Sequence, residues 1–176
     1  LILINTCRVL RDTIGFAEAD AYIAETIDII ERCFVNEEYQ AVLETVGPEG
    51  EIIDHFDGQL HNHGAALELA WFILHEAWQR GNDARLIALG CKILDSSWER
   101  GWDQEFGGIF YFRDLKGLPV QEYWQDMKFW WPQNEAIIAT LLAYALTRKE
   151  KYASWHTLIH DWTYKHFPDP EYGEWF

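Results

Sequence analysis

Two histidines and an asparagine stand together as His61-Asn62-His63, directly before an apolar segment. A His-x-His pair can chelate zinc, but a zinc site takes three or four ligands and no cysteine lies near this stretch in the sequence. The three letters do not indicate a nuclease either, because a nuclease needs a positively charged surface for DNA. The plainer interpretation is a helix start, with Asn62 as its cap and Gly64 easing the entry. We therefore expect no metal site here.

The helical segment that follows carries polar and aromatic side chains on one face. Glu68, Trp71 or Phe72, and His75 recur at the spacing of successive helical turns. A face that combines a carboxylate, an indole and an imidazole is not an ordinary apolar stripe. It is either the solvated edge of an amphipathic helix or the lining of a wet cavity, and the sequence leaves both interpretations open.

A second group of chemically useful residues lies between Lys128 and Glu135, in the run Lys-Phe-Trp-Trp-Pro-Gln-Asn-Glu. Two adjacent tryptophans point in different directions, so one can enter the core while Trp131 faces a pocket. Pro132 suits the first turn of a helix, and a carboxylate at Glu135 would then be favoured there by the free N–H groups without any function. Alternatively, Glu135 forms a set of hydroxyl-binding groups with Trp131, Gln133 and Asn134.

A third group is Trp102-Asp103, which precedes the turn Gly107-Gly108. An aspartate beside a tryptophan on a loop is typical of a sugar-contacting pair. It is equally typical of a plain Asx turn, in which the carboxylate accepts from nearby backbone N–H groups. The residues alone do not decide between the two.

Composition narrows the kind of ligand. The chain has 29 acidic and 14 basic residues and a net charge of −15, which argues against nucleic acid or an anionic membrane as a partner. Ten tryptophans within an aromatic content of 16% favour a pocket in which sugar rings stack, because indole offers both a flat face and an N–H donor. We expect a small neutral ligand.

The cysteines and the chain ends suggest a cytoplasmic protein seen in part. Cys7, Cys33 and Cys91 are far apart and form no CxxC pair, which predicts reduced thiols in a cytoplasmic protein. No signal peptide and no apolar run of membrane-spanning length is present. The chain opens inside the apolar run 1–4 and lacks an initial Met, so we expect a segment of a longer chain.

Helical periodicity dominates the sequence and predicts an all-α fold. A hairpin of short strands is expected at 40–46 and 51–53, around the turn at 47–50, and a further strand at 109–112. Asn82 is the expected cap of the fourth helix. The alternation of tight turns and long loops predicts a toroid of helical hairpins, formed here by one domain over 1–176. The predicted helices are 1–12, 17–34, 64–78, 83–97, 132–148 and 150–166.

Four stretches resemble the N-acylglucosamine 2-epimerase family, which is also known for the renin-binding protein. They are Gly-Trp-Asp at 101–103, Gly-Gly-Ile-Phe-Tyr-Phe at 107–112, Met-Lys-Phe-Trp-Trp-Pro at 127–132 with Glu-Ala at 135–136, and Asp-Pro-Glu-Tyr-Gly-Glu-Trp-Phe at 169–176. The resemblance covers essentially the whole chain. It implies an (α/α)6 toroid longer than 176 residues, so residues 1–176 would be a partial toroid domain, truncated at both ends.

The resemblance also implies a reaction. Family members interconvert N-acetylglucosamine and N-acetylmannosamine by removing and returning a proton at C2 of the ring-opened sugar. Two histidines serve as the bases, since their pKa lies near neutrality, and a carboxylate or amide steadies the developing enediolate. No metal or other cofactor is implied. The family's likeness to other sugar epimerases and aldose–ketose isomerases leaves the exact sugar open.

The family pattern Asn-Pro-Gly-His-x-x-Glu falls on residues 62–68. His63 stands at the proline position and Ala65 at that of the catalytic histidine. Ala65 cannot transfer a proton, which leaves His63, two residues earlier, as a candidate replacement. The family's second histidine lies in a motif beyond Phe176. The resemblance therefore implies a homologue with impaired proton transfer.

The remaining family positions complete the candidate site. Glu68 and Glu135 match the family carboxylates, Trp131 is a stacking platform, and Gln133 stands where the family usually has histidine. The candidate catalytic residues are Glu68, Glu135 and His63. Those proposed to bind substrate are Asn62, Trp71, Trp102, Asp103, Lys128, Trp131 and Gln133. The alternatives are a catalytically silent sugar-binding or protein-interaction module and a related aldose–ketose isomerase.

A partial toroid would also leave apolar helix faces uncovered. Apolar patches above a few hundred Å² seldom stay bare on a soluble protein. We therefore expect the isolated chain to form a homo-oligomer.

Overall fold

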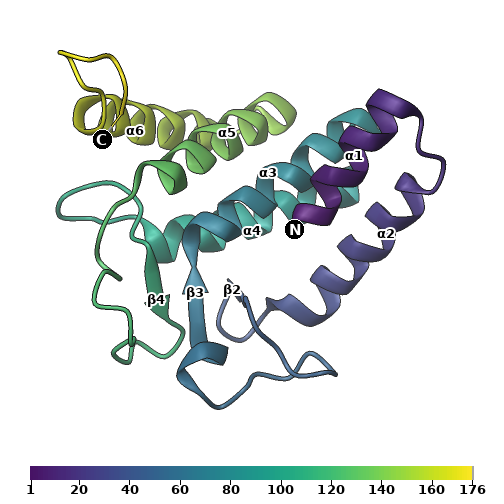
Figure 1. Ribbon diagram of the computed structural model, residues 1–176, viewed down its shortest axis with the longest axis horizontal. Helices are drawn as coiled ribbons and strands as arrows, with labels where there is room; N and C mark the ends of the chain where they lie inside the picture. Colours follow the sequence, from purple (N-terminus) through teal and green to yellow (C-terminus); the bar gives the residue numbers. More distant parts are fainter. Residues whose placement is uncertain (176) are drawn as a thin grey trace.

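The computed structural model describes residues 1–175, and its helices and short strands follow one another in the order expected of helical hairpins (Figure 1). All six predicted helices are confirmed. The helices are α1 Ile2–Ile14, α2 Ala19–Ile29, extended by a π-helical turn over Ile30–Phe34, α3 His63–Gln79, α4 Ala84–Gly101, α5 Trp130–Thr147 and α6 Glu150–His166. The strands are β1 Val35–Asn36, β2 Ala41–Val42, β3 Leu60–Asn62 and β4 Phe112–Asp114.

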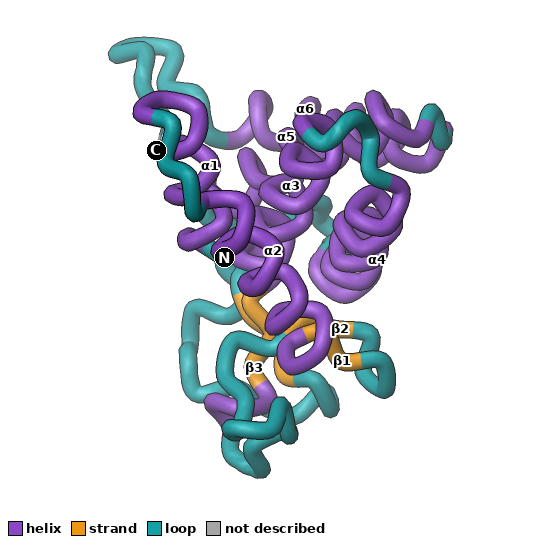
Figure 2. The backbone as a smooth tube through the Cα atoms, turned by 90° about the vertical axis from the view of Figure 1, so that its right-hand side faces the viewer, coloured by secondary structure: helices purple, strands orange, loops and turns teal. Residues whose placement is uncertain are grey.

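The helices form hairpins that pack side by side. The pairs α1–α2, α3–α4 and α5–α6 are each joined by a short connection and are in contact along their lengths. Helix α3 is central, because it packs against α4, α5 and α1. Figures 1 and 2 show the strands and long loops gathered at one end of the helices. The start of α3 therefore opens into this loop-rich end, where β3 leads directly into it.

The helix starts are fixed by side-chain caps. Asn62 Oδ1 accepts from the backbone N–H of Ala65 at 3.1 Å, which confirms the predicted cap of α3. The predicted cap of α4 is wrong by one residue, since Asp83 Oδ1 accepts from Leu86 N–H at 3.0 Å. Asn82 instead takes the left-handed backbone conformation, with φ 67°, which asparagine tolerates better than most residues.

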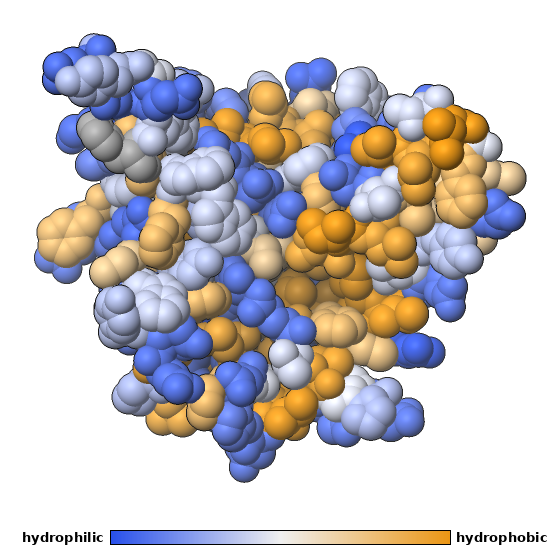
Figure 3. All heavy atoms as spheres, viewed as in Figure 1, coloured by the Kyte–Doolittle hydropathy of each residue, from blue (hydrophilic) through white to orange (hydrophobic). Residues whose placement is uncertain are grey.

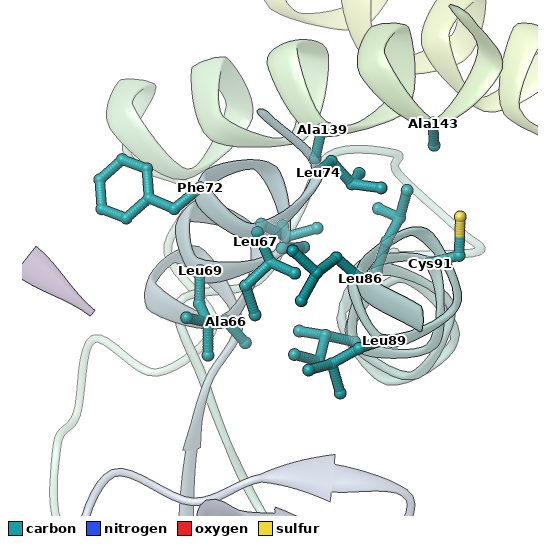
Figure 4. Close-up of a cluster of buried hydrophobic side chains, with 14 of the residues drawn as sticks. Ala66, Leu67, Leu69, Phe72, Leu74, Leu86, Leu89, Cys91, Ala139 and Ala143 are labelled. Carbon is teal, nitrogen blue, oxygen red and sulfur yellow. The ribbon is translucent and has the colours of Figure 1, made fainter. Parts of the chain in front are cut away.

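The core is built where α3 meets α4 and α5 (Figure 4). Leu67 and Leu74 of α3 are fully buried, and each such side chain contributes about 1.5–3 kcal/mol by leaving water. Small residues on the partner helices let the backbones approach. Ala139 of α5 is fully buried, and a Cβ at Gly90 of α4 would lie 2.7 Å from Leu74 Cγ. Larger side chains at these positions would push the helices apart.

The strands are shorter than predicted and pair differently. The first hairpin joins β1 to β2 in antiparallel register, with Val35 opposite Val42, so its turn lies at 37–40. The turn predicted at 47–50 is present, with Gly50 N–H bonded to the Gly47 carbonyl at 2.9 Å, but the expected strand at 51–53 is not formed. The second sheet pairs β3 with β4, placing His61 opposite Arg113. Its long-range pairing was not visible in the local sequence pattern.

Apolar side chains also reach the surface, as the orange area over α1 and α2 on the right of Figure 3 shows. Those of α1 with more than 45% exposure are Ile2, Leu3, Val9 and Ile14. Leu141 of α5 is 51% exposed. These side chains fit the expected self-association, which stays a prediction that sedimentation velocity can test. In the described residues no helix is both long and apolar enough to cross a bilayer.

Candidate active site

Helices α3 and α5 bring two carboxyl groups and an indole together. Trp71 of α3 donates its Nε1–H to Glu135 Oε2 of α5. Glu68 lies one helical turn before Trp71 on α3, close enough to Glu135 for the Glu135 charge to act on it. All three side chains are half-buried. The structure therefore assembles residues 64 or more positions apart in sequence into one polar patch between two core helices.

Both carboxyl groups of this patch resist ionisation. Burial raises the pKa of Glu68, and the neighbouring Glu135 carboxylate raises it further. Burial also raises the pKa of Glu135, although the hydrogen bond from Trp71 opposes the change. Carboxyl groups with raised pKa values can hold a proton closer to neutral pH and can both donate to and accept from a sugar hydroxyl.

The alternative explanation of Glu135 as a first-turn residue is wrong. Helix α5 begins at Trp130, two residues earlier than predicted, and its first turn has no acidic residue. Glu135 therefore gains little from the free N–H groups of the helix start, because that effect falls off within the first turn. Its half-buried position beside Trp71 of another helix is therefore not explained by the helix start.

The polar face of α3 continues away from the loop end through His75. Arg8 of α1 lies 2.8 Å from His75 Nδ1, and since arginine can only donate, Nδ1 accepts. Burial and then the Arg8 charge lower the pKa of His75. Arg8 also bonds to Asn5. The face of Glu68, Trp71 and His75 thus contacts α1 through His75 and α5 through Trp71, so it is not a fully solvated helix edge.

Ala65 borders a pocket of about 410 Å³ at the start of α3. Asn62 and Glu44 supply polar groups to its wall, and the remainder is mostly apolar, from α1, α2 and β2. Asn62 Nδ2 donates to Glu44 Oε1 at 2.9 Å, while burial raises the pKa of Glu44. The sequence did not indicate Glu44, because no local pattern around it predicts a contact with Asn62, 18 positions later.

The two histidines before α3 are buried and neutral. His61 and His63 are both fully buried, with ring centroids 4.4 Å apart. Burial lowers the pKa of His61 to about 3, and burial with the neighbouring His61 lowers that of His63 well below its usual value. Their four ring nitrogens have no hydrogen-bond partner among residues 1–175. In the same residues, no group of three or more His, Cys, Asp or Glu side chains could hold a metal ion.

His63 lies on a different side of α3 from Glu68. The two positions are five residues apart, or about 140° around the helix. The His63 ring packs against Gly101 of α4, where a Cβ would come within 2.8 Å of it. Its role as a replacement base stays a prediction, and in this conformation the ring faces α4.

Gly64 has a packing role that the sequence did not reveal. A Cβ at this position would collide with the indole of Trp131 and lie 3.0 Å from Pro132 Cγ. The glycine therefore lets the starts of α3 and α5 touch. Trp131 is half-buried and meets Tyr111 edge-on, with ring centroids 5.8 Å apart. This places the expected stacking platform against the first turn of α3.

Gln133 holds the start of α5 onto the loop before it. Its Oε1 accepts from Ile109 N–H at 2.7 Å, and its Nε2 donates to the carbonyls of Ile109 and Phe129 at 2.9 and 3.1 Å. The side chain is fully buried. Its expected bond to a sugar hydroxyl stays a prediction, since the amide is already occupied by the backbone.

The Gln133→Ala variant is expected to lose about 2–4 kcal/mol of unfolding free energy, because two backbone groups of Ile109 would be left buried without partners. Urea denaturation of this variant and of Asn134→Ala, a half-buried neighbour, provides the comparison. Equal stabilities of the two variants would contradict this role for Gln133.

Asp103 and Lys128 form an ion pair that shapes a loop. Asp103 Oδ1 accepts from the N–H groups of Glu105 and Phe106 at 2.9 and 3.1 Å, and its Oδ2 lies 2.5 Å from Lys128 Nζ. Burial opposes ionisation of Asp103, but the Lys128 bond and the backbone donors outweigh it and lower the pKa. This geometry is that of the Asx turn. Sugar contacts by either residue stay a prediction.

Trp102 belongs to a stack of three indoles. Its ring lies 4.8 Å from that of Trp98, and Trp98 lies 4.7 Å from Trp155, with interplanar angles of 6° and 8°. Trp98 is almost fully buried, whereas Trp102 is half-buried. Stacking therefore anchors α6 to the end of α4, and sugar binding by Trp102 stays a prediction.

A buried ion-pair cluster was also missed. Glu76 of α3 is fully buried and accepts two bonds from Arg11 of α1, at 2.9 and 3.0 Å, and one from Arg80 at 2.6 Å. Burial opposes its ionisation, but these bonds outweigh that effect and lower the pKa of Glu76. The signal available in the sequence was an acidic residue within an apolar helix, which indicates a charged partner.

Helical hairpins that pack side by side are the arrangement expected of an (α/α)6 toroid protein. The structure matches a cellobiose 2-epimerase from Bacillus thermoamylovorans with a TM-score of 0.80 and 20% identity, over 99% of this chain and 42% of that one. It matches a sugar epimerase from a ruminal bacterium with a TM-score of 0.79 and 15% identity, over 98% and 42%. These likenesses show the fold and confirm the predicted toroid class.

The chain belongs to the N-acylglucosamine 2-epimerase family, whose model matches residues 16–176. It is 46% identical to N-acylglucosamine 2-epimerase of Bos taurus over 139 residues, covering 78% of this chain and 32% of the relative. With the human protein of that name it shares 36% over 143 residues, covering 81% and 33%. The family resemblance is thus confirmed, and the chain spans about a third of the length of these relatives.

Proposed function

We propose that the chain is the sugar-binding part of a 2-epimerase that acts on N-acetylglucosamine and N-acetylmannosamine. The observation that carries the proposal is the half-buried carboxyl pair of Glu68 and Glu135, joined across two helices by Trp71. Burying a carboxyl group costs free energy of folding unless the group is hydrogen-bonded or paired with a charge. Carboxyl groups that are kept in such positions often have a function. A ring-opened sugar offers hydroxyl groups that both can bind, and indole faces suit its C–H surfaces.

The chemistry follows from the acidity of C2 beside the C1 aldehyde. A base removes the C2 proton, the electron pair forms a C1–C2 double bond, and negative charge collects on O1. Return of a proton to the opposite face of C2 inverts that carbon. In the proposed role, Glu68 or Glu135 in its protonated form donates a hydrogen bond to O1, where the charge develops, and the other carboxylate orients a neighbouring hydroxyl.

In the proposed reaction, this chain lacks the base that would remove the C2 proton. Ala65 holds the family's histidine position and has no group that can accept the C2 proton. The pocket of about 410 Å³ that it borders has room for an imidazole side chain there. We therefore expect sugar binding with slow proton exchange.

The same observation favours a second candidate function. Without a base at Ala65, the chain could be a catalytically silent sugar-binding or protein-interaction module. An aldose–ketose isomerase acting on an aldose with a hydroxyl group at C2 is a third possibility. It shares the removal of the C2 proton, but a proton returns to C1, the C2 hydroxyl loses its proton to become the carbonyl, and the C1 oxygen becomes a hydroxyl. Detection of a ketose by NMR, in place of the C2 epimer, would identify it.

The proposal is tested by sugar affinity. N-acetylmannosamine is expected to bind the chain, and Glu68→Gln and Glu135→Gln are compared. Whichever of the two replaces the ionised carboxylate is expected to weaken binding about tenfold to a hundredfold, as loss of a charged hydrogen-bond partner does. Calorimetric titration measures the affinity. Glu99→Gln on the exposed side of α4 is the matched control. Equal sugar affinity of the parent chain and all three variants, or no binding by any of them, would contradict the proposal.

A further inference from the structure

Helix α6 carries two histidines one turn apart, His156 and His160. Residues four apart on an α-helix are neighbours on its surface, and the two ring centroids are 6.0 Å apart. His156 is half-buried beside α5, and His160 is exposed. The proposed function uses neither of them.

The hydrogen bonds of His156 fix which nitrogen is free. Its Nδ1 lies 3.1 Å from the carbonyl oxygen of Ile137, which can only accept, so Nδ1 carries the proton. Nδ1 also lies 3.3 Å from Thr140 Oγ1, whose own proton goes to the Ala136 carbonyl at 2.7 Å. Both neighbours of Nδ1 are therefore acceptors. The lone pair of the neutral ring is on Nε2.

His160 has the same arrangement. Its Nδ1 lies 3.3 Å from Asp161 Oδ1, and a carboxylate accepts, so Nδ1 is again the protonated nitrogen. Metal-binding histidines characteristically donate their second N–H to a carboxylate or a backbone carbonyl, which fixes the tautomer and makes the other nitrogen a better ligand. Both histidines of α6 have that support.

We propose that His156 and His160 together bind one Cu²⁺, Ni²⁺ or Zn²⁺ ion through their Nε2 atoms, with water completing the coordination. Metal–nitrogen bonds of about 2.0–2.1 Å bring two imidazole centroids to about 5 Å from each other. The ring of exposed His160, which stacks on Tyr164 at 4.6 Å, has to shift by about 1 Å to reach that separation. Imidazole ligands select Cu²⁺ most strongly among these ions, whereas Mg²⁺ and Ca²⁺ prefer oxygen ligands.

The test is a Cu²⁺ titration of the metal-free protein, followed by electron paramagnetic resonance, which counts the coordinated nitrogens. One tightly bound Cu²⁺ with two imidazole nitrogens is expected. His160→Asn, at an exposed position that leaves the fold intact, is expected to leave one nitrogen and to weaken binding at least tenfold. His156→Asn should do the same.

His166→Asn is the matched control. His166 is on the same helix and also holds its Nδ1 against a carbonyl, that of Trp162 at 2.6 Å, but the residue one turn before it is Trp162 and not a histidine. This variant is expected to bind Cu²⁺ as the parent chain does. A single nitrogen in the parent, unchanged binding by His160→Asn, or equally tight binding of Mg²⁺ to this acidic chain would overturn the site.

Discussion

The Ala65→His variant is expected to exchange the C2 proton of N-acetylmannosamine with solvent about 10²- to 10⁴-fold faster than the parent chain, the usual contribution of one positioned base. Ala65 follows the capping residue Asn62 by three positions and borders the pocket at the start of α3. It also precedes Glu68 by one turn, so an imidazole there would lie beside the carboxyl pair. Exchange needs only one base, although inversion needs two.

Proton NMR in D2O measures this exchange as loss of the C2–H signal. Ala65→Gln is the control, because glutamine is of similar size and cannot titrate. It should exchange no faster than the parent chain. If Ala65→His binds the sugar and still fails to exchange, the start of α3 is not where proton transfer occurs and the silent-module alternative is favoured.

Lowering the pH from 7 to 5 is expected to remove about 2 kcal/mol of unfolding free energy through His61 alone. The folded pKa of His61 is about 3, whereas an unfolded histidine titrates near 6.5. Between these values the unfolded chain binds a proton that the folded chain refuses, so stability falls as pH falls through this window. His63, with its pKa also lowered, adds in the same direction.

Carboxyl groups with raised pKa values have the opposite effect on the unfolding free energy as the pH falls. Glu68 and Glu135 favour protonation in the folded state, so they offset part of the loss as the pH falls. The two buried histidines act in the destabilising direction over this range, since both bind protons in the unfolded chain and resist them in the folded one. The loss of about 2 kcal/mol through His61 is itself a substantial fraction of the about 5–15 kcal/mol that stabilises a typical domain.

Urea denaturation at pH 8, 7, 6 and 5 measures this dependence. His61→Phe removes the titration without breaking a hydrogen bond, because neither ring nitrogen has a partner among the described residues. The variant is expected to reduce the slope between pH 6 and 5 by about 1.2 kcal/mol per pH unit. At pH 8 both proteins are neutral at this position, so a difference there reports packing alone. An unchanged slope in His61→Phe would contradict burial of a neutral His61.

The helices were predictable because their signals are local. The periodic apolar residues of α3 and the cap at Asn62 lie within a few positions of one another, and both were confirmed. The strand pairing of β3 with β4 was not predictable, since it joins residues about 50 positions apart and neither strand is long enough to show alternation. The cap at Asp83 was missed because Asn82 and Asp83 both suit that position.

The sequence indicated which residues belong to the candidate site better than it indicated how they are arranged in space. Glu68 and Trp71 share a helix face by spacing alone, whereas their meeting with Glu135 depends on how α3 packs against α5. Gln133 and Asp103 were assigned to ligand binding from residue type, but both are occupied by backbone groups that only the fold brings near them. Burial likewise lowers the pKa of His63, and no local sequence pattern indicates that this side chain is buried.

The central claim is that the patch of Glu68, Trp71 and Glu135 is where the sugar binds. The most direct test follows the indole N–H signals by two-dimensional NMR while N-acetylglucosamine is added. The Trp71 signal, from the N–H bonded to Glu135, is expected to shift in a saturable way. The Trp162 signal, from the N–H bonded to the Phe106 carbonyl at 2.8 Å, should stay in place. Saturating sugar that leaves the Trp71 signal unmoved would contradict the claim.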